Sequence, residues 1–263
     1  MSHSTLGEVY RYSTKFEEAL EAYRKALDIF EGGDDQENIA RVRQQRGVCY
    51  MELGRYEDAK ADLLSSLRFY EASGNVRDYP RCLQRLARLY IRQHDLEQSR
   101  RLFDKAMQEA SKSRDIDTIV VSLVRVARLE VDEGASSQTV REFYARLEQI
   151  IQEHQYQNPQ HLGQMKMILS HALFREKELR EALSLYAEGM ADIAAQRRGP
   201  YLVSDYLREI EERIEQLPKS DRLAWYQALR MEWTKRGIQQ THPEMISFCS
   251  IGERTATMAD KAT

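Results

Sequence analysis

Glycine and proline are scarce in this sequence, with 12 and 5 among 263 residues. Both residues interrupt regular helices, so their scarcity favours long helices joined by short turns. No apolar run approaches the roughly 20 residues that span a bilayer, so we expect no contact with a membrane. The first residues of the chain also lack the apolar core of a secretory signal, which favours a cytoplasmic protein.

Residues that usually carry chemistry are few and scattered. The three cysteines, Cys49, Cys82 and Cys249, include no close pair, so we expect buried thiols in a reducing setting. No two of the six histidines are four residues apart, and the phosphate-binding and dinucleotide-binding glycine motifs are missing. A net charge of −3 gives no basic excess for nucleic acid. The sequence therefore predicts no cofactor, no metal, no nucleic-acid partner and no enzymatic activity.

The stretch from Gln36 to Asn75 is repeated along the chain. It predicts two amphipathic helices joined by a turn at Gly54. Aligning the copies on one small residue of the first helix gives a spacing of 40, with three extra residues before the fifth copy. We place these three residues in the polar linker at 154–163. The aligned small residues are Gly7, Gly47, Ala87, Ala127 and Ser170.

The second helix of each copy carries its own fixed pair, a small residue followed four positions later by a large one. Small residues let two helices approach closely and large ones fill the gap opposite, so the pattern predicts stacked helix pairs. The small residues are Ala19, Ala59, Ser99, Thr139 and Ala182, and the large ones are Tyr23, Leu63, Phe103, Phe143 and Tyr186.

This pattern resembles the tetratricopeptide repeat, whose signature is Leu-Gly-x-x-Tyr in the first helix and Ala-x-x-x-Phe in the second. The first copy carries Leu6-Gly7-x-x-Tyr10 and Ala19-x-x-x-Tyr23. A spacing of 40 in place of the family's 34 is similar to its longer-repeat members. The resemblance covers residues 4–194 and implies an all-α fold, a right-handed helical-repeat solenoid of antiparallel helix pairs. It implies little about function, because one scaffold serves many partners.

We expect three regions along the chain. Residues 1–199 form five repeat-like helix pairs, the fifth ending at 197–199. Residues 200–237 form a C-terminal capping pair, whose second helix is capped by Ser220 and buries Trp225 and Trp233 on one face. Residues 238–263 are short of apolar periodicity and form a flexible tail. A minority alternative makes the tryptophan face a docking ridge for a partner.

The N-terminal edge is a candidate for self-association. Its first helix presents Leu6, Val9 and Tyr10 near an open end, whereas a capping repeat normally shows a polar outer face. We expect this edge to pack on a second copy, on a partner or on an upstream segment.

Arginines recur at equivalent positions of the first helices, which line the concave face in this family. Copies three and four carry Arg85 with Arg88 and Arg125 with Arg128, and no acid occupies those rows in copies two to five. Either acids from second helices neutralise the cluster, or it is solvated, or it binds an anion through guanidinium forks. The candidate partner-binding residues are Arg81, Arg85, Arg88, Arg125, Arg128, Gln45 and His171.

Chaperone-binding members of the family hold a carboxylate with a clamp of basic and asparagine side chains. Arg81 and Arg85 match two of its basic positions, and Gln45 stands where asparagine is expected. Ser4 and Glu8 do not match the other two positions. The resemblance therefore favours an acidic peptide or protein surface over a chaperone tail.

The sequence as a whole predicts a non-catalytic adaptor that binds a protein or peptide in its concave groove, and the arginines favour an acidic one. Two alternatives stay open. One is a sensor or regulatory array of a bacterial signal-transduction NTPase or transcriptional regulator. The other is a peptide-pheromone receptor of the helical-repeat type.

Overall fold

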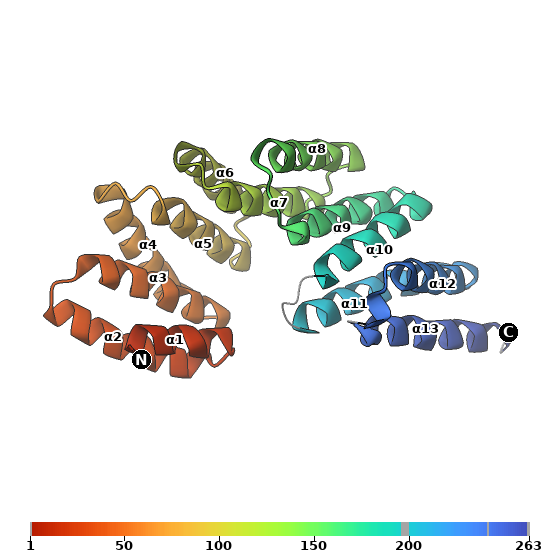
Figure 1. Ribbon diagram of the computed structural model, residues 1–263, viewed down its shortest axis with the longest axis horizontal. Helices are drawn as coiled ribbons and strands as arrows, with labels where there is room; N and C mark the ends of the chain where they lie inside the picture. The colour runs from red at the N-terminus through yellow and green to blue at the C-terminus, as the bar shows by residue number, and fades with distance from the viewer. Residues whose placement is uncertain (1, 196–199, 241, 262–263) are drawn as a thin grey trace. The chain divides into compact units, whose positions relative to one another are not determined.

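The computed structural model describes residues 2–195, 200–240 and 242–261, which contain helices and no strand (Figure 1). The chain divides into two compact units, Met1–Val126 and Ala127–Thr263. The first six helices are α1 (His3–Tyr12), α2 (Phe16–Gly32), α3 (Gln36–Glu52), α4 (Tyr56–Ala72), α5 (Asp78–Arg92) and α6 (Leu96–Ser113). Helix α7 (Ile116–Asp132) contains the unit boundary. The others are α8 (Ser137–His154), α9 (Pro159–Arg175), α10 (Leu179–Ala194), α11 (Pro200–Glu215), α12 (Lys219–Lys235), the 3-10 turn η1 (Ile238–Gln240) and α13 (Pro243–Lys261). None of the helices in these ranges is both long and apolar enough to cross a bilayer.

The 40-residue period is visible in the turns between helices. From α1 to α10, each turn places one residue in the left-handed backbone region, which most residues other than glycine adopt only rarely. Within the pairs these residues are Thr14, Gly54, His94, Gly134 and Lys177. Between the pairs they are Asp34, Gly74, Arg114 and Gln155. The all-α helical-repeat architecture is therefore confirmed.

The sequence predicts that the three extra residues of the fifth copy lie in the linker at 154–163. In the structure only two of them lie there. The other lies in the turn between α7 and α8. The spacing of 40 from Asp95, the N-cap of α6, predicts that α8 is capped at residue 135, but its N-cap is Ser136. Two lie between Gln155 and Asn158, the N-cap of α9. Because α8 begins one residue late, Val140 takes the buried position expected for Thr139.

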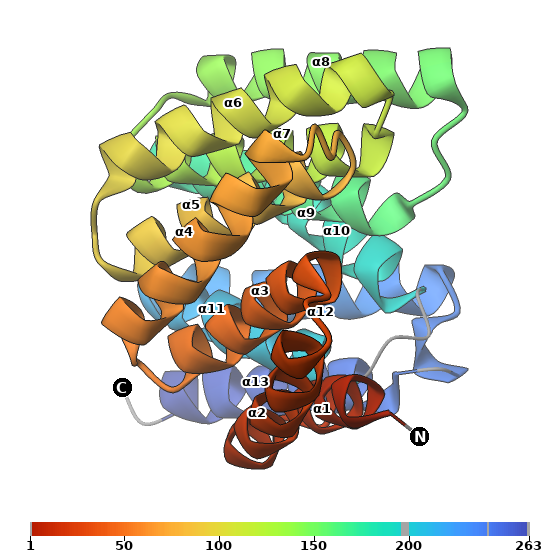
Figure 2. The ribbon, with the colours of Figure 1, turned by 90° about the vertical axis from the view of Figure 1, so that its left-hand side faces the viewer.

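Helix pairs in the first unit pack through the small residues that the sequence singles out. Ala19, Ala59 and Ser99 are fully buried, and Tyr23 and Leu63 fill the space beside them. Helix α1 lies against α2, and α2 against α3 (Figure 2). At the N-terminal edge Leu6 and Tyr10 are partly buried, while Val9 is 46% exposed.

A close helix approach in the second unit joins α9 and α10. A Cβ on Gly163 would lie 2.6 Å from the carbonyl oxygen of Gly189, and a Cβ on Gly189 would lie 2.5 Å from that of Gly163. The two backbones therefore touch, and only glycine fits at either position.

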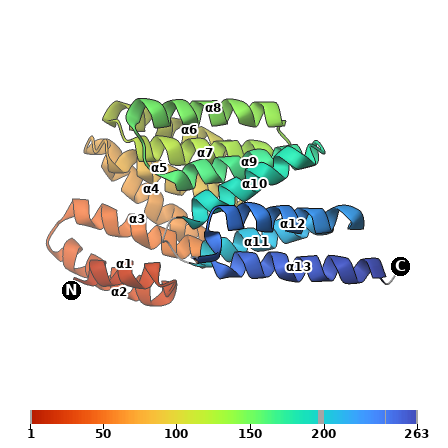
Figure 3. The same ribbon diagram turned by 45° about the vertical axis from the view of Figure 1, so that its right-hand side comes forward.

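The C-terminal region differs from the sequence expectation in two respects. Helix α12 begins at Lys219 with Pro218 as its N-cap, so Ser220 does not cap it. Residues 243–261 form α13 and not a flexible tail, because Met245 and Cys249 are fully buried and α13 packs on α12 (Figure 3). The expected end of the fifth pair at 197–199 lies outside the described residues.

The two tryptophans of α12 are core residues. Trp233 is fully buried and its Nε1 donates to the carbonyl of Ala187 at 3.0 Å, which joins α12 to α10. Trp225 is 5% exposed and meets Phe174 edge-on at 5.7 Å. The core interpretation of this stripe is confirmed, and the docking ridge is wrong.

His171 of α9 is buried, whereas the sequence predicts it on a partner-binding surface. It is 2% exposed and stacks on Tyr186 with ring centroids 6.3 Å apart. Desolvation lowers its pKa well below the usual range, and the charges of Arg213, Arg128 and Arg175 add to this effect. The imidazole is therefore neutral in the folded protein.

The first testable prediction concerns helix register. Ala59→Leu should overpack the contact between α3 and α4 and lower the free energy of unfolding by about 1–3 kcal/mol. Ala61→Leu, two residues further along the same helix on an exposed position, should change it by no more than about 0.5 kcal/mol. Urea unfolding of both variants makes the comparison, and equal losses would refute the register.

The second prediction tests the helix crossing in the other unit. Gly163→Ala should cost about 1–3 kcal/mol of unfolding free energy, because its Cβ meets a backbone atom that cannot move aside. Gly32→Ala is the matched control, since a Cβ there meets nothing within 4 Å. The crossing would be looser than described if both variants melted at the same temperature as the parent.

The third prediction concerns pH. A histidine whose folded pKa is depressed binds its proton more readily in the unfolded chain. The free energy of unfolding is therefore fully retained above the unfolded pKa of about 6.5 and falls as pH drops below it. His171→Phe should flatten this slope between about pH 5.5 and 7, measured by urea titration. His94→Gln, in an exposed turn, should leave the slope as it is; a steep slope in the His171 variant would contradict the assignment.

Candidate functional site

Helix α5 carries three of the candidate arginines on one face. Acids from neighbouring elements neutralise two of them. The Nε of Arg81 donates to Asp115 at 3.1 Å, and an Nη of Arg88 lies 3.3 Å from Glu52. Asp115 also accepts from the backbone N–H of Thr118, so it caps α7 while it holds Arg81. The counter-charges of these two arginines therefore come from α3 and from the start of α7, and not from the second helices that one alternative expected.

Arg85 lies between them in the sequence and has a different environment. Among the described residues its guanidinium makes one hydrogen bond, from Nη1 to the backbone carbonyl of Gln44 at 3.3 Å, and no ion pair. Burial lowers its pKa, and the charge of Arg11 lowers it further. This arginine carries a desolvated charge without a carboxylate beside it.

Arg88 and Arg125 are close enough to repel one another within the first unit. Desolvation lowers the pKa of Arg88 to about 10, and the charge of Arg125 is the next largest cause. Arg125 is exposed on α7. We call Arg85, Arg88 and Arg125 the first-unit arginine cluster. The single carboxylate paired with Arg88, Glu52, is shared with Arg92 at 3.4 Å.

Arg128 belongs to the second unit and is paired there. Its Nε lies 3.0 Å from Asp132 and its Nη2 lies 3.2 Å from Glu209 of α11. Glu209 also accepts from Arg213 at 3.3 Å and lies 3.4 Å from Nε2 of His171. Acids outside the aligned rows therefore neutralise Arg128, one from its own helix and one from α11.

The arrangement expected for a chaperone-type carboxylate clamp is not assembled. Arg81 is held by Asp115, and Ser4 is 7% exposed. The Oε1 of Gln45 is buried and has no hydrogen-bond partner among the described residues. These side chains of α3 and α5 are therefore not arranged as the carboxylate clamp requires.

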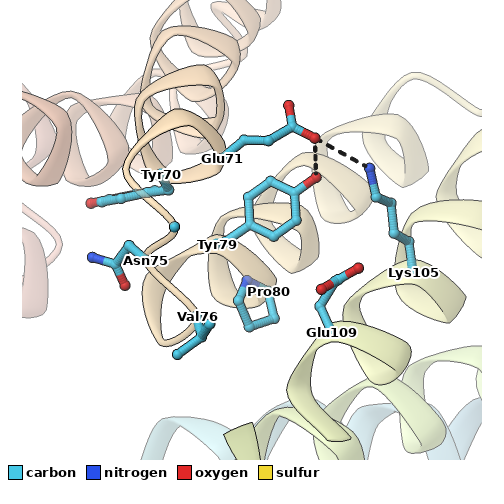
Figure 4. Close-up of a pocket in the computed structure, with 9 residues that line it drawn as sticks. Tyr70, Glu71, Asn75, Val76, Tyr79, Pro80, Lys105 and Glu109 are labelled. Atoms are coloured by element: carbon cyan, nitrogen blue, oxygen red, sulfur yellow. Dashed lines mark hydrogen bonds and ion pairs between the residues drawn. The ribbon is translucent and has the colours of Figure 1, made fainter. Parts of the chain in front are cut away.

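A surface cavity of about 240 Å³ lies where α4, α5 and α6 meet (Figure 4). Its polar groups satisfy one another. The hydroxyl of Tyr79 donates to Glu71 at 3.0 Å, and the ammonium of Lys105 lies 3.9 Å from the same carboxylate. This cavity has no unbalanced charge that would call for a ligand.

The cysteines are buried, as the sequence analysis expects. Burial raises the pKa of Cys49 to about 11 and those of Cys82 and Cys249 to about 12, so all three are thiols at neutral pH. Within the described residues no three His, Cys, Asp or Glu side chains come together as metal ligands.

Residues 1–72 match the family model described as tetratricopeptide repeat. No curated protein matches the chain by sequence. Solved structures match it by fold. One is a Rap conjugation gene regulator of the plasmid pLS20 in complex with the Phr* peptide, at 15% identity and a TM-score of 0.58, over 97% of this chain and 74% of that one.

Two further structures have a similar fold. A Rap protein complexed with competence and sporulation factor gives 14% identity and a TM-score of 0.59, over 98% of this chain and 74% of that one. A signal-transduction ATPase with numerous domains and a tetratricopeptide repeat sensor, from Pyrococcus horikoshii, gives 11% identity and a TM-score of 0.63. There the match covers 97% of this chain and 41% of that protein. Residues 1–72 are therefore similar in sequence to the tetratricopeptide repeat, and the chain shares the helical-repeat fold of these structures.

Proposed function

We propose that this protein is a non-catalytic adaptor that binds a peptide or protein segment carrying acidic side chains through the first-unit arginine cluster. The observation that carries the proposal is the shortage of carboxylates beside Arg85 and Arg88. Arg85 has no carboxylate beside it, and Arg88 is paired with an acid that it shares with Arg92.

Like charges on adjacent helices are unfavourable, and partial burial makes the repulsion stronger than it would be in water. A carboxylate from a ligand relieves this repulsion and accepts two parallel hydrogen bonds from one guanidinium. Guanidinium groups stay protonated near neutral pH, so they suit anion binding better than proton transfer. These properties favour recognition over catalysis.

The fold supports a peptide or protein ligand. Two of the similar structures are Rap proteins in complex with peptide factors, although identities of 14–15% extend only the fold to this chain. The second candidate function is a sensor array within a larger signalling system. It is favoured by the match to the sensor-bearing ATPase, of which this chain spans 41%.

The fourth prediction tests the binding surface. From a displayed library of random peptides, the full chain should enrich sequences containing Asp or Glu, and the Arg88→Glu/Arg125→Glu variant should lose that enrichment. Affinity for a selected peptide should fall by about tenfold or more in the variant, since two charge contacts are reversed. It should also weaken with salt, because exposed charges are screened within about 8–10 Å at physiological ionic strength.

A matched control changes the same amount of charge elsewhere in the first unit. Arg101→Glu/Lys112→Glu alters two exposed side chains of α6, whose acidic partners are other residues of that helix. This variant should enrich the same peptides as the parent. Enrichment of acidic peptides by the Arg88/Arg125 variant, or none by the parent, would overturn the proposal.

A further inference from the structure

Glu52, the last residue of α3, divides its carboxylate between two arginines of α5. Its Oε1 lies 3.3 Å from Nη2 of Arg88, and its Oε2 lies 3.4 Å from Nη2 of Arg92. A guanidinium can donate two parallel hydrogen bonds to one carboxylate. Because Arg92 holds the second oxygen of Glu52, Arg88 does not form such a two-bond contact with it.

These contacts are looser than a scaffold ion pair of the same unit. Asp62 accepts two hydrogen bonds from Arg46, at 2.7 and 2.8 Å, and its side chain is 9% exposed. The side chain of Glu52 is 25% exposed, and those of Arg88 and Arg92 are 38% and 53% exposed. Hydrogen bonds between a guanidinium and a carboxylate are usually about 2.7–2.9 Å long. Glu52 is therefore a weak partner of Arg88, at a position that a carboxylate from solution can reach.

The place of Glu52 in its own helix does not explain the acid. Backbone carbonyls make the C-terminal end of a helix negative, so a carboxylate there is unfavourable. Glu52 ends α3, and the last turn of α3 contains no basic residue that would offset its charge. A neutral side chain would suit this helix end better. The contacts that the structure describes for the carboxylate come from arginines of α5.

We infer that Glu52 is an internal competitor, whose carboxylate takes the place at Arg88 that a carboxylate of the ligand occupies in the complex. This inference rests on the proposed function, because it concerns how an acidic ligand gains access to the first-unit arginine cluster. A ligand that offers both carboxylate oxygens to Arg88 displaces Glu52, which stays with Arg92. Glu52 therefore sets the strength of contact that an acidic ligand must exceed, and it is a specificity-determining residue of the site.

The fifth prediction concerns removal of the competitor. The probe is the acidic peptide that the parent chain enriches most strongly from the random library. Glu52→Gln keeps the shape of the side chain and removes its charge. It should bind this peptide about three- to fivefold more tightly, which is the effect of one exposed ion pair. The affinity should also fall more steeply with salt, because the cluster has lost a counter-charge. Fluorescence anisotropy of the labelled peptide, at low and at physiological salt, measures both effects.

Arg92 provides a change in the opposite direction. Arg92→Gln leaves Glu52 free to pair with Arg88 alone, so the carboxylate competes more effectively and the peptide affinity should fall about twofold. The same change should have a smaller effect in the Glu52→Gln background, where the competitor is already absent. This double-mutant cycle separates competition from direct contact. Losses of equal size in the two backgrounds would contradict the inference, because Arg92 would then act independently of Glu52.

Glu97→Gln is the matched control. It removes one exposed carboxylate of the first unit, which pairs with Arg101 of its own helix, and it should bind the peptide as the parent does. Thermal unfolding of the same variants tests a purely structural role. If Glu52 only stabilised the scaffold, Glu52→Gln would lower the Tm and leave binding unchanged or weaker.

The outcomes separate this inference from the proposed function on which it rests. If the parent binds acidic peptides and Glu52→Gln binds them no more tightly, the inference is overturned and the proposed function stands. If neither the parent nor Glu52→Gln enriches acidic peptides, the proposed function fails and the inference fails with it. Tighter binding by Glu52→Gln but not by Glu97→Gln supports the inference.

Discussion

Close contact between the two helices of each pair is the constraint on which the rest of this structure depends. A helix of 17 residues cannot bury its apolar stripe alone, so each second helix must come near its first, and a small side chain at one position makes that possible. Ala59 touches Gly47 in this way, with Leu63 filling the adjoining space. In the second unit the same requirement goes further, to backbone contact between Gly163 and Gly189. The crossing points fix which faces of the helices are buried, and therefore where their charged side chains emerge.

The charged side chains fall into two classes according to what the crossings bring near them. Some arginines meet acids that belong to the scaffold: Arg46 forms a two-bond contact with Asp62, and Arg81 reaches Asp115 at the start of α7. Arg85 is desolvated by the same packing, and its hydrogen bond among the described residues goes to a backbone carbonyl and not to a carboxylate. Burying a charge without a counter-ion is unfavourable. Stability alone therefore does not explain an arginine such as Arg85, which lacks a carboxylate partner. The proposed function rests on that difference.

The sequence could predict a good deal of the fold, because packing codes are local. The spacing of 40 residues, the small positions at Ala19, Ala59 and Ala182 and the buried tryptophan stripe of α12 are all found in the structure. The predicted register of α8 is wrong by one residue, because its N-cap is Ser136 and not residue 135. Nothing in the apolar pattern of the sequence marks the extra residue. The starts of the first helices carry a clearer signal, because Asp35, Asn75, Asp115 and Asn158 each accept a backbone N–H there. The sequence did not predict α13, because its apolar residues are too few to show helical periodicity. They are buried only because α13 packs on α12, where Gly252 lies against the ring of Tyr226.

The sequence by itself determined that the chain is a helical repeat of long period and that arginines recur on its first helices. Both properties depend on residues a fixed distance apart along the chain. Only the tertiary structure decided which of those arginines are paired. Glu52 and Glu209 approach Arg88 and Arg128 from positions 36 and 81 residues away, so their distance in space is set by helix packing and not by sequence spacing. For the same reason the sequence could not show that His171 is buried. Electrostatic partners are chosen by three-dimensional proximity and desolvation, whereas helix periodicity is fixed by backbone geometry within a few residues.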